Sequence, residues 1–408
     1  MLILFIEKLW NTLKRNPQLS ILFFLFSFAN VLGLLYTAAL PDLTKYFHVA
    51  KDQAQQTISF FLLGYALGQI VFAPLSNALG RKLAIYIGLS IAILGSVLCL
   101  ISIELNLFSL LLFGRILTAF GASCGLMLTF TLVGDSFTHA QGKKILSYLI
   151  CGFAAFPAIG IVLGGFITEH LSWKSCFYFM LVYSFLVMGL CVLLPETAKD
   201  RHLRHLKISR IAQSYLKQAR HLLFILCALL MACAGVIIYI FSAEAPFIAI
   251  NQLHLSPDLF GLYNLFPYIG LCLGGFTSAH LSHKLSSKSW ILLGSCLFVI
   301  SSLFMLILFE AGFVNVFTLF VIPLLTFFAV PIILANCSAL ALMISEDKAY
   351  ASSLMNAIQI FLVFLCVASL SFFPSQKASI LPMVYSISGV LMILLWILLK
   401  TLPIEEKT

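Results

Sequence analysis

Charged residues are scarce in this chain of 408 residues. Asp, Glu, Lys and Arg make up 10% of it, whereas 62% of the residues are hydrophobic, which is more apolar surface than a water-soluble domain of this length can hide. The G-x-x-x-x-G-K-[ST] loop that binds phosphate is also missing, which excludes an ATP-driven pump of that class. The sequence therefore predicts a membrane protein.

Patterns that would hold a metal or a redox centre are missing as well. The eleven cysteines include no C-x-x-C pair and lie in or beside apolar stretches, where they are expected to pack as small hydrophobic side chains. The nine histidines lie mainly outside those stretches and form no ligand pair within one. We therefore expect no enzyme, no cofactor and no metal site.

Long apolar stretches dominate the sequence. A bilayer core about 30 Å thick needs about 20 apolar residues per helix. We predict an all-α integral membrane protein with twelve transmembrane helices in two six-helix halves. The predicted spans are residues 19–41, 54–76, 83–102, 107–134, 144–167, 174–195, 221–247, 257–281, 289–309, 313–340, 347–373 and 378–400.

The basic residues indicate how the spans are oriented. Of the 24 Lys and Arg residues, nineteen lie in one set of alternate loops and four in the other, and Arg115 lies inside a span. Because positive loops stay on the cytoplasmic side, both termini are predicted to be cytoplasmic. The formal charge of +9 is thus explained by topology, and we expect the lipid bilayer as a partner and no nucleic acid.

A polar linker divides the chain into two similar parts. We predict an N-terminal half over 1–195, a cytoplasmic linker over 196–221 and a C-terminal half over 222–408. The pattern Gly64-x-x-x-Gly68 returns as Gly270-x-x-x-Gly274, which favours an internal repeat, although small residues also serve ordinary close packing between helices. Internal repeats of six spans are typical of transporters that bind substrate between their halves.

The stretch GYALGQIVFAPLSNALGRK, 64–82, resembles the loop between the second and third spans of the Major Facilitator Superfamily, above all its Bcr/CflA group of drug:proton antiporters. The residues that carry the match and that the resemblance links to conformational change include Gly68, Gly80, Arg81 and Lys82. Asn77 stands where the group has an aspartate of a charged cytoplasmic latch. The resemblance implies a weakened or re-sited latch, with Asp135 taking over part of it.

Four more motifs follow in the order of that family. They are LLFGRILTAFGASCG at 111–125, VGDSF at 133–137, GFAAFPAIGIVLGG at 152–165 and SAEAPFIAINQLHLSPDLFGLYN at 242–264. The third resembles the antiporter motif of the fifth span, which the family links to a tight proton barrier. It does so through Gly152, Pro157, Gly160, Gly164 and Gly165.

Two ionisable residues inside spans are candidates for transport. Such a residue costs about 2.5–3.5 kcal/mol to insert and usually faces protein or water. Arg115 lies about eight residues into its span, roughly 12 Å deep, and we predict that it binds an anionic group or tunes a carboxylate; the alternative is a structural ion pair. Glu244 is expected near the outer interface. There it either acts in transport, by gating, by binding a cationic substrate or by exchanging a proton, or is only a hydrated acid at the membrane surface. Leu34 replaces the acid that the group carries in its first span, so the candidate proton carriers are Glu244 and Asp135.

Uncharged polar residues within spans are candidates for the substrate cavity, with helix–helix hydrogen bonding as the alternative. They are Asn30, Tyr36, Asn264, Tyr268, Asn356 and Gln359.

The resemblance implies a monomeric secondary transporter of the bacterial inner membrane. We expect proton-coupled efflux of small amphipathic drugs or metabolites by alternating access. Because Leu34 and Asn77 replace acids, uptake or facilitated exchange of a metabolite or siderophore-like compound remains an alternative.

Overall fold

The described residues of the computed structural model are 17–137, 139–198, 208–281, 284–345, 348–372 and 377–402, and these contain helices and no β-strand. The first half comprises α2 (Pro17–Leu34), η1 (Leu35–Ala39), α3 (Leu40–Phe47), α4 (Lys51–Leu79), α5 (Arg81–Glu104), α6 (Phe108–Ser136), α7 (His139–His170) and α8 (Ser175–Cys191).

The linker helix α9 (Ile208–Ala219) leads to the second half. That half comprises α10 (Leu222–Pro246), η3 (Phe247–Gln252), α11 (Pro257–Tyr263), α12 (Leu265–Leu281), α13 (Ser287–Glu310), η5 (Phe317–Val321), α14 (Pro323–Met343), α15 (Lys348–Ala368), η6 (Ser369–Phe372) and α16 (Ile380–Thr401).

Ten helical runs in the described residues are long and apolar enough to cross a bilayer. The apolar part of α7, Ala155–His170, and the shorter helix α8 occupy the positions of the predicted fifth and sixth spans. The all-α membrane fold expected from the sequence is therefore confirmed.

Proline explains where several spans change geometry. Proline has no N–H group, and its ring clashes with the carbonyl group four residues earlier. The first predicted span is thus three segments, because Pro41 follows the 3₁₀ turn η1. Pro246 precedes the π-helical segment η3, and Pro267 lies in the first turn of α12, just after the break from α11 at Asn264. These breaks lie beside the candidate residues described below.

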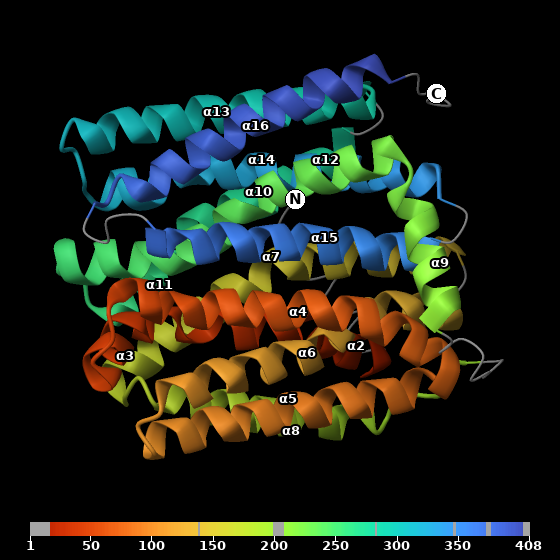
Figure 1. Ribbon diagram of the computed structural model, residues 1–408, viewed down its shortest axis with the longest axis horizontal. Helices are drawn as coiled ribbons and strands as arrows, with labels where there is room; N and C mark the ends of the chain where they lie inside the picture. The colour runs from red at the N-terminus through yellow and green to blue at the C-terminus, as the bar shows by residue number, and fades with distance from the viewer. Residues whose placement is uncertain are drawn as a thin grey trace.

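The two halves lie side by side in Figure 1, with α2–α8 in the lower part and α10–α16 in the upper part. Helix α4 packs on α15, and α7 packs on α11 and α12, so these helices form the boundary between the halves. Helix α9 crosses this boundary at one end of the molecule, which we call the linker end. The end that carries α3 and η3 is called the opposite end.

The two G-x-x-x-G patterns make equivalent contacts in the two halves. A Cβ atom on Gly64 would lie 2.2 Å from the carbonyl oxygen of Ile116 in α6, and one on Gly270 would lie 2.1 Å from that of Leu324 in α14. Gly68 and Gly274 approach their partner helices one turn further along. The repeat seen in the sequence is therefore a repeat of helix packing.

Candidate functional site

Glu244, at the end of α10, is joined to the first half by an ion pair. Lys51 Nζ, in the first turn of α4, donates to Glu244 Oε2 at 2.6 Å, and Gln55 Nε2 donates to Glu244 Oε1 at 2.8 Å. The Glu244 side chain is only 2% exposed, and that of Lys51 is 16% exposed. Because Gln55 also bonds the carbonyl oxygen of Ala243, three polar contacts tie the halves together at the opposite end.

Sequence reasoning identified Glu244 and missed its partners. Gln55 lies in the first turn of the predicted span 54–76 and Lys51 in the loop just before it, where polar residues are ordinary. The one available signal was that Lys51 is among the few basic residues on the side of the membrane predicted to carry few positive charges. The contact joins residues 193 positions apart, and no local pattern encodes such a pair.

Arg115, on α6, is enclosed within the first half. Its guanidinium group donates to the carbonyl oxygens of Leu32 at 2.8 Å and Gly33 at 3.2 Å. It also lies 4.3 Å from the ring centres of Tyr36 and Phe61. The last carbonyl groups of an α-helix lack partners within the helix. Arg115 therefore caps the end of α2, where the first span changes to the 3₁₀ turn.

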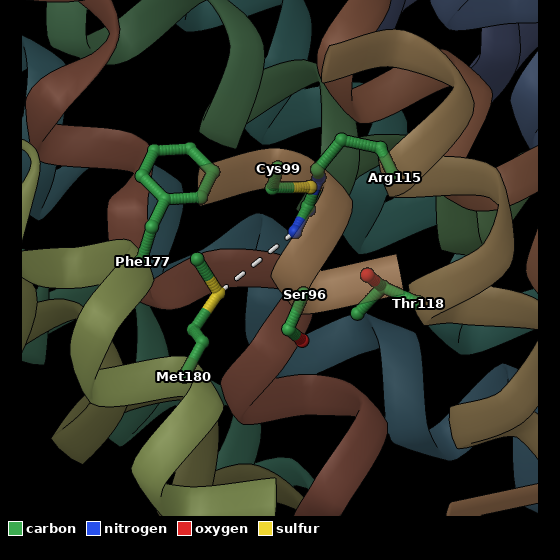
Figure 2. A pocket seen from close by; sticks show the side chains of 6 residues that line it. All are labelled: Ser96, Cys99, Arg115, Thr118, Phe177 and Met180. Atoms are coloured by element: carbon green, nitrogen blue, oxygen red, sulfur yellow. Dashed lines mark hydrogen bonds between the residues drawn. The ribbon is translucent and has the colours of Figure 1, made fainter. Parts of the chain in front are cut away.

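A small pocket lies beside Arg115, between α5, α6 and α8 (Figure 2). It has no room for even one water-sized sphere, whereas pockets that bind small molecules measure roughly 300–1,000 Å³. Arg115 Nη1 points across it toward the sulfur of Met180, at 3.9 Å. This pocket is internal to one half and is too small for a drug-sized substrate.

At the linker end, Arg81 organises the turn between α4 and α5. Its guanidinium group donates to Asn77 Oδ1 at 2.7 Å and to Asp135 Oδ2 at 3.1 Å. The Glu196 carboxylate accepts the backbone N–H groups of Arg81 and Lys82. Gly80, directly before α5, has a φ of 101°, which favours glycine. Asp135 thus supplies the carboxylate that Asn77 lacks, within the first half.

The glycines of the fifth span pack against both halves. A Cβ atom on Gly164 would lie 1.6 Å from the Leu35 carbonyl oxygen in η1, and one on Gly165 would lie 2.3 Å from that of Pro257 in α11. Gly160 faces α2 at the looser distance of 3.8 Å. Pro157 lies inside α7, and Gly152 lies outside the residues whose surroundings are described.

The predicted cavity residues are not in one place. Tyr36 lies under Arg115 and its hydroxyl group is 2.8 Å from Thr57 Oγ1, and the Asn264 amide donates to the Phe260 carbonyl oxygen. The Tyr36 contact joins two helices, as the alternative expects, whereas the Asn264 bond stays within its own segment. Asn30, Asn356 and Gln359 are half-buried.

Tyr268 differs from the other candidates. Its side chain is 2% exposed and its hydroxyl group has no hydrogen-bond partner in the described part of the chain.

Known proteins resemble the chain in sequence and in fold. An uncharacterized transporter of Rickettsia bellii is 29% identical over 64% of this chain and 63% of its own length. The bicyclomycin resistance protein homolog of Haemophilus influenzae is 23% identical over 68% of this chain and 70% of its own length. The chain thus spans about three fifths of the Rickettsia relatives' length.

Among solved structures, the xylose transporter XylE from E. coli in a partially occluded inward open conformation superposes with a TM-score of 0.73 at 14% identity. The match covers 95% of this chain and 99% of that one. The sequence model described as Major Facilitator Superfamily matches residues 19–360. The resemblance to the Bcr/CflA-like group is supported by the relatives named for bicyclomycin and multidrug resistance. The chain belongs to the Major Facilitator Superfamily.

Proposed function

We propose that this transporter exports small amphipathic drugs or metabolites in exchange for protons, by alternating access between its two halves. The observation that carries the proposal is the buried ion pair between Lys51 and Glu244, which joins one half to the other at the opposite end. Opening that end requires the pair to separate, and this leaves a carboxylate that can accept a proton. Relatives named for drug resistance support export.

Glu244 is the proposed proton carrier. While the opposite end is closed, the ammonium group of Lys51 is paired with the carboxylate at 2.6 Å. When the halves part there, Glu244 loses Lys51 and Gln55 together and becomes accessible to a proton. Closing the end again brings Lys51 back and displaces the proton. The carboxylate thus alternates between a proton and Lys51, once in each transport cycle.

The other candidate groups have supporting roles in this proposal. Arg115 holds the broken first span in place from within the first half, and Asp135 stabilises the turn at the linker end through Arg81. A membrane potential of 100 mV drives one charge with about 2.3 kcal/mol, which sustains nearly fifty-fold accumulation of a neutral substrate. A single carboxylate therefore suffices as the carrier.

We place this protein in the bacterial inner membrane as a monomer with both termini cytoplasmic, and we assign 1–195, 196–221 and 222–408 as its halves and linker. The sparse basic residues of one set of loops support this topology. A reporter that is active only in the periplasm, fused within 196–221, should be silent. Activity from that fusion would overturn the assignment.

The carrier is tested by flux in proteoliposomes against an imposed pH gradient. We expect Glu244→Gln to abolish the dependence of flux on the pH gradient. Asp135→Asn, which neutralises an acid at the linker end, is the matched control and should lower the rate of flux but keep its dependence on the gradient. Flux by the wild-type protein that ignores the gradient would favour the facilitator reading, which Leu34 at the family's acidic position supports.

A further inference from the structure

The linker helix α9, which crosses the boundary between the halves in Figure 1, is bonded to both of them. It carries Tyr215, whose hydroxyl group donates to the carbonyl oxygen of Ile70 in α4 at 3.0 Å and lies 3.3 Å from Ser353 Oγ in α15. The Ser353 hydroxyl donates to the carbonyl oxygen of Gln69, the residue before Ile70. Two hydroxyl groups, one from the linker and one from the second half, therefore converge on adjacent carbonyl groups of the first half.

Pro74 explains why α4 offers an acceptor at this point. In an α-helix the carbonyl oxygen of Ile70 would accept the N–H group of residue 74. Residue 74 is a proline inside α4 and has no N–H group. The Ile70 carbonyl group thus lacks its usual donor within the helix, and the Tyr215 hydroxyl takes that place. A proline within a span creates a docking point for a side chain of the linker.

The second half holds the ring of Tyr215 in position. The ring centre of Tyr215 lies 5.3 Å from that of Tyr350 in α15, with an angle of 75° between the rings. This edge-to-face arrangement is favourable for aromatic side chains. Tyr215 is buried, and so is Gln218, one turn later on the same face of α9. Helix α9 therefore lies with one face against the boundary between the halves.

Polar contacts consequently join the halves at both ends of α4. Lys51, which pairs with Glu244, and Ile70 are nineteen residues apart on this helix. That separation is about 28 Å at 1.5 Å per residue, close to the thickness of roughly 30 Å of the hydrocarbon core. The ion pair closes the opposite end, and the hydroxyl groups close the linker end. In alternating access the two sets of contacts break in turn, because only one end is open at a time.

We infer that Tyr215 is a gate residue of the linker end. Its bond to the Ile70 carbonyl group forms when that end closes and breaks when that end opens, and Pro74 provides the acceptor. The linker is then a working part of the transporter as well as a connection between its halves. This inference rests on the alternating access of the proposed function and is independent of proton coupling.

Distances between spin labels at the linker end test whether the contact closes it. Bio-orthogonal labels at the exposed residues Gly134 in α6 and Lys348 in α15 report one position in each half. Tyr215→Phe keeps the ring against Tyr350 and removes only the hydroxyl group. We expect it to raise the ratio of open to closed molecules at this end about tenfold, since a hydrogen bond is lost and its acceptor is left unpaired.

Tyr178→Phe, on the exposed face of α8, is the matched control and should keep the wild-type distances. A distance distribution in Tyr215→Phe that equals that of the wild type would overturn the inference.

A rescue experiment tests the role of Pro74. Because Tyr215→Phe leaves the Ile70 carbonyl group without its donor, the unfolding midpoint in detergent should fall by a few degrees. Adding Pro74→Ala supplies a backbone N–H group and should restore the midpoint, while the linker end stays open because the hydroxyl group is still missing. Pro331→Ala, which replaces a proline inside α14, is the matched control and should not restore it. A midpoint that Pro74→Ala does not raise in the Tyr215→Phe background would contradict the assignment of the acceptor.

The gate and the antiport can fail separately in these experiments. If flux by the wild-type protein ignores a pH gradient while the variants behave as expected, the proposed antiport is wrong and the gate stands. If flux follows the gradient and the labels in Tyr215→Phe keep the wild-type distances, the gate is wrong and the antiport stands.

Discussion

Replacing Lys51 by Met should open the opposite end of the molecule. Removing one partner of a buried ion pair costs about 3–5 kcal/mol, because the other charge stays buried without compensation. Glu244 is 2% exposed and keeps the hydrogen bond from Gln55, so we take the lower value. About 3 kcal/mol changes the ratio of closed to open molecules roughly a hundredfold.

The two partners should not be equivalent. In Glu244→Gln the remaining ammonium group is on a side chain that is 16% exposed and long enough to reach water, so the cost is smaller. In Lys51→Met the remaining carboxylate has no such route. The double variant removes both charges and should recover most of the closed population. The closed population should therefore fall most in Lys51→Met, less in Glu244→Gln and least in the double variant. This order follows from the exposed fractions of the two side chains and not from the distance between them.

The assay is the distance between spin labels on α3 and η3, which pack against each other at the opposite end. Labels introduced by bio-orthogonal chemistry at the exposed residues Lys45 and Gln252 leave the native cysteines in place. We expect one short distance in the wild type and an added longer one in Lys51→Met. Lys174→Met is the control, because Lys174 contacts Tyr46 within one half. An unchanged distribution in Lys51→Met would refute the reasoning.

Three further predictions concern packing and positioning. Gly164→Ala should abolish flux and shorten the thermal half-life in detergent, because its Cβ atom would lie 1.6 Å from the Leu35 carbonyl oxygen. Gly189 has open space around it, so Gly189→Ala should behave as wild type in the same two measurements. Arg115→Ala should insert in normal amounts and lose flux. Arg115→Lys should recover only part of the flux, since an ammonium group lacks the planar fork with which Nη1 and Nη2 reach the two carbonyl groups. Full flux in the alanine variant would contradict the capping role. Tyr215→Phe should lower the transport rate severalfold with unchanged insertion. The Tyr215 hydroxyl donates to the carbonyl oxygen of Ile70 in α4 at 3.0 Å and lies 3.3 Å from Ser353 Oγ in α15, so it joins the linker helix to both halves. A wild-type transport rate would show that this contact is dispensable.

The sequence predicted the fold well because hydrophobic length and basic residues in loops are local signals. The repeat was visible in Gly64-x-x-x-Gly68 and Gly270-x-x-x-Gly274. At these four positions the partner helix lies so close that it leaves no room for a Cβ atom, so the same packing in each half leaves the same glycine pattern in the sequence. The broken spans were missed because Pro41 and Pro246 lie within apolar stretches that hydropathy does not divide.

The candidate site was less predictable, because its contacts join distant residues. The depth of Arg115 indicated burial but not its partners, which are backbone carbonyl groups and carry no sequence signal. Glu244 was found as an intramembrane acid, whereas Lys51 became a partner only when the two halves were placed together.

Proton movement that accompanies substrate flux tests the central claim most directly. Proteoliposomes are loaded with a pH-sensitive dye and with a compound that the wild-type protein transports, at equal pH inside and outside. The account predicts that efflux of the compound acidifies the interior in the wild type and leaves the pH unchanged in Glu244→Gln. Efflux by the wild-type protein without any change in internal pH would contradict it.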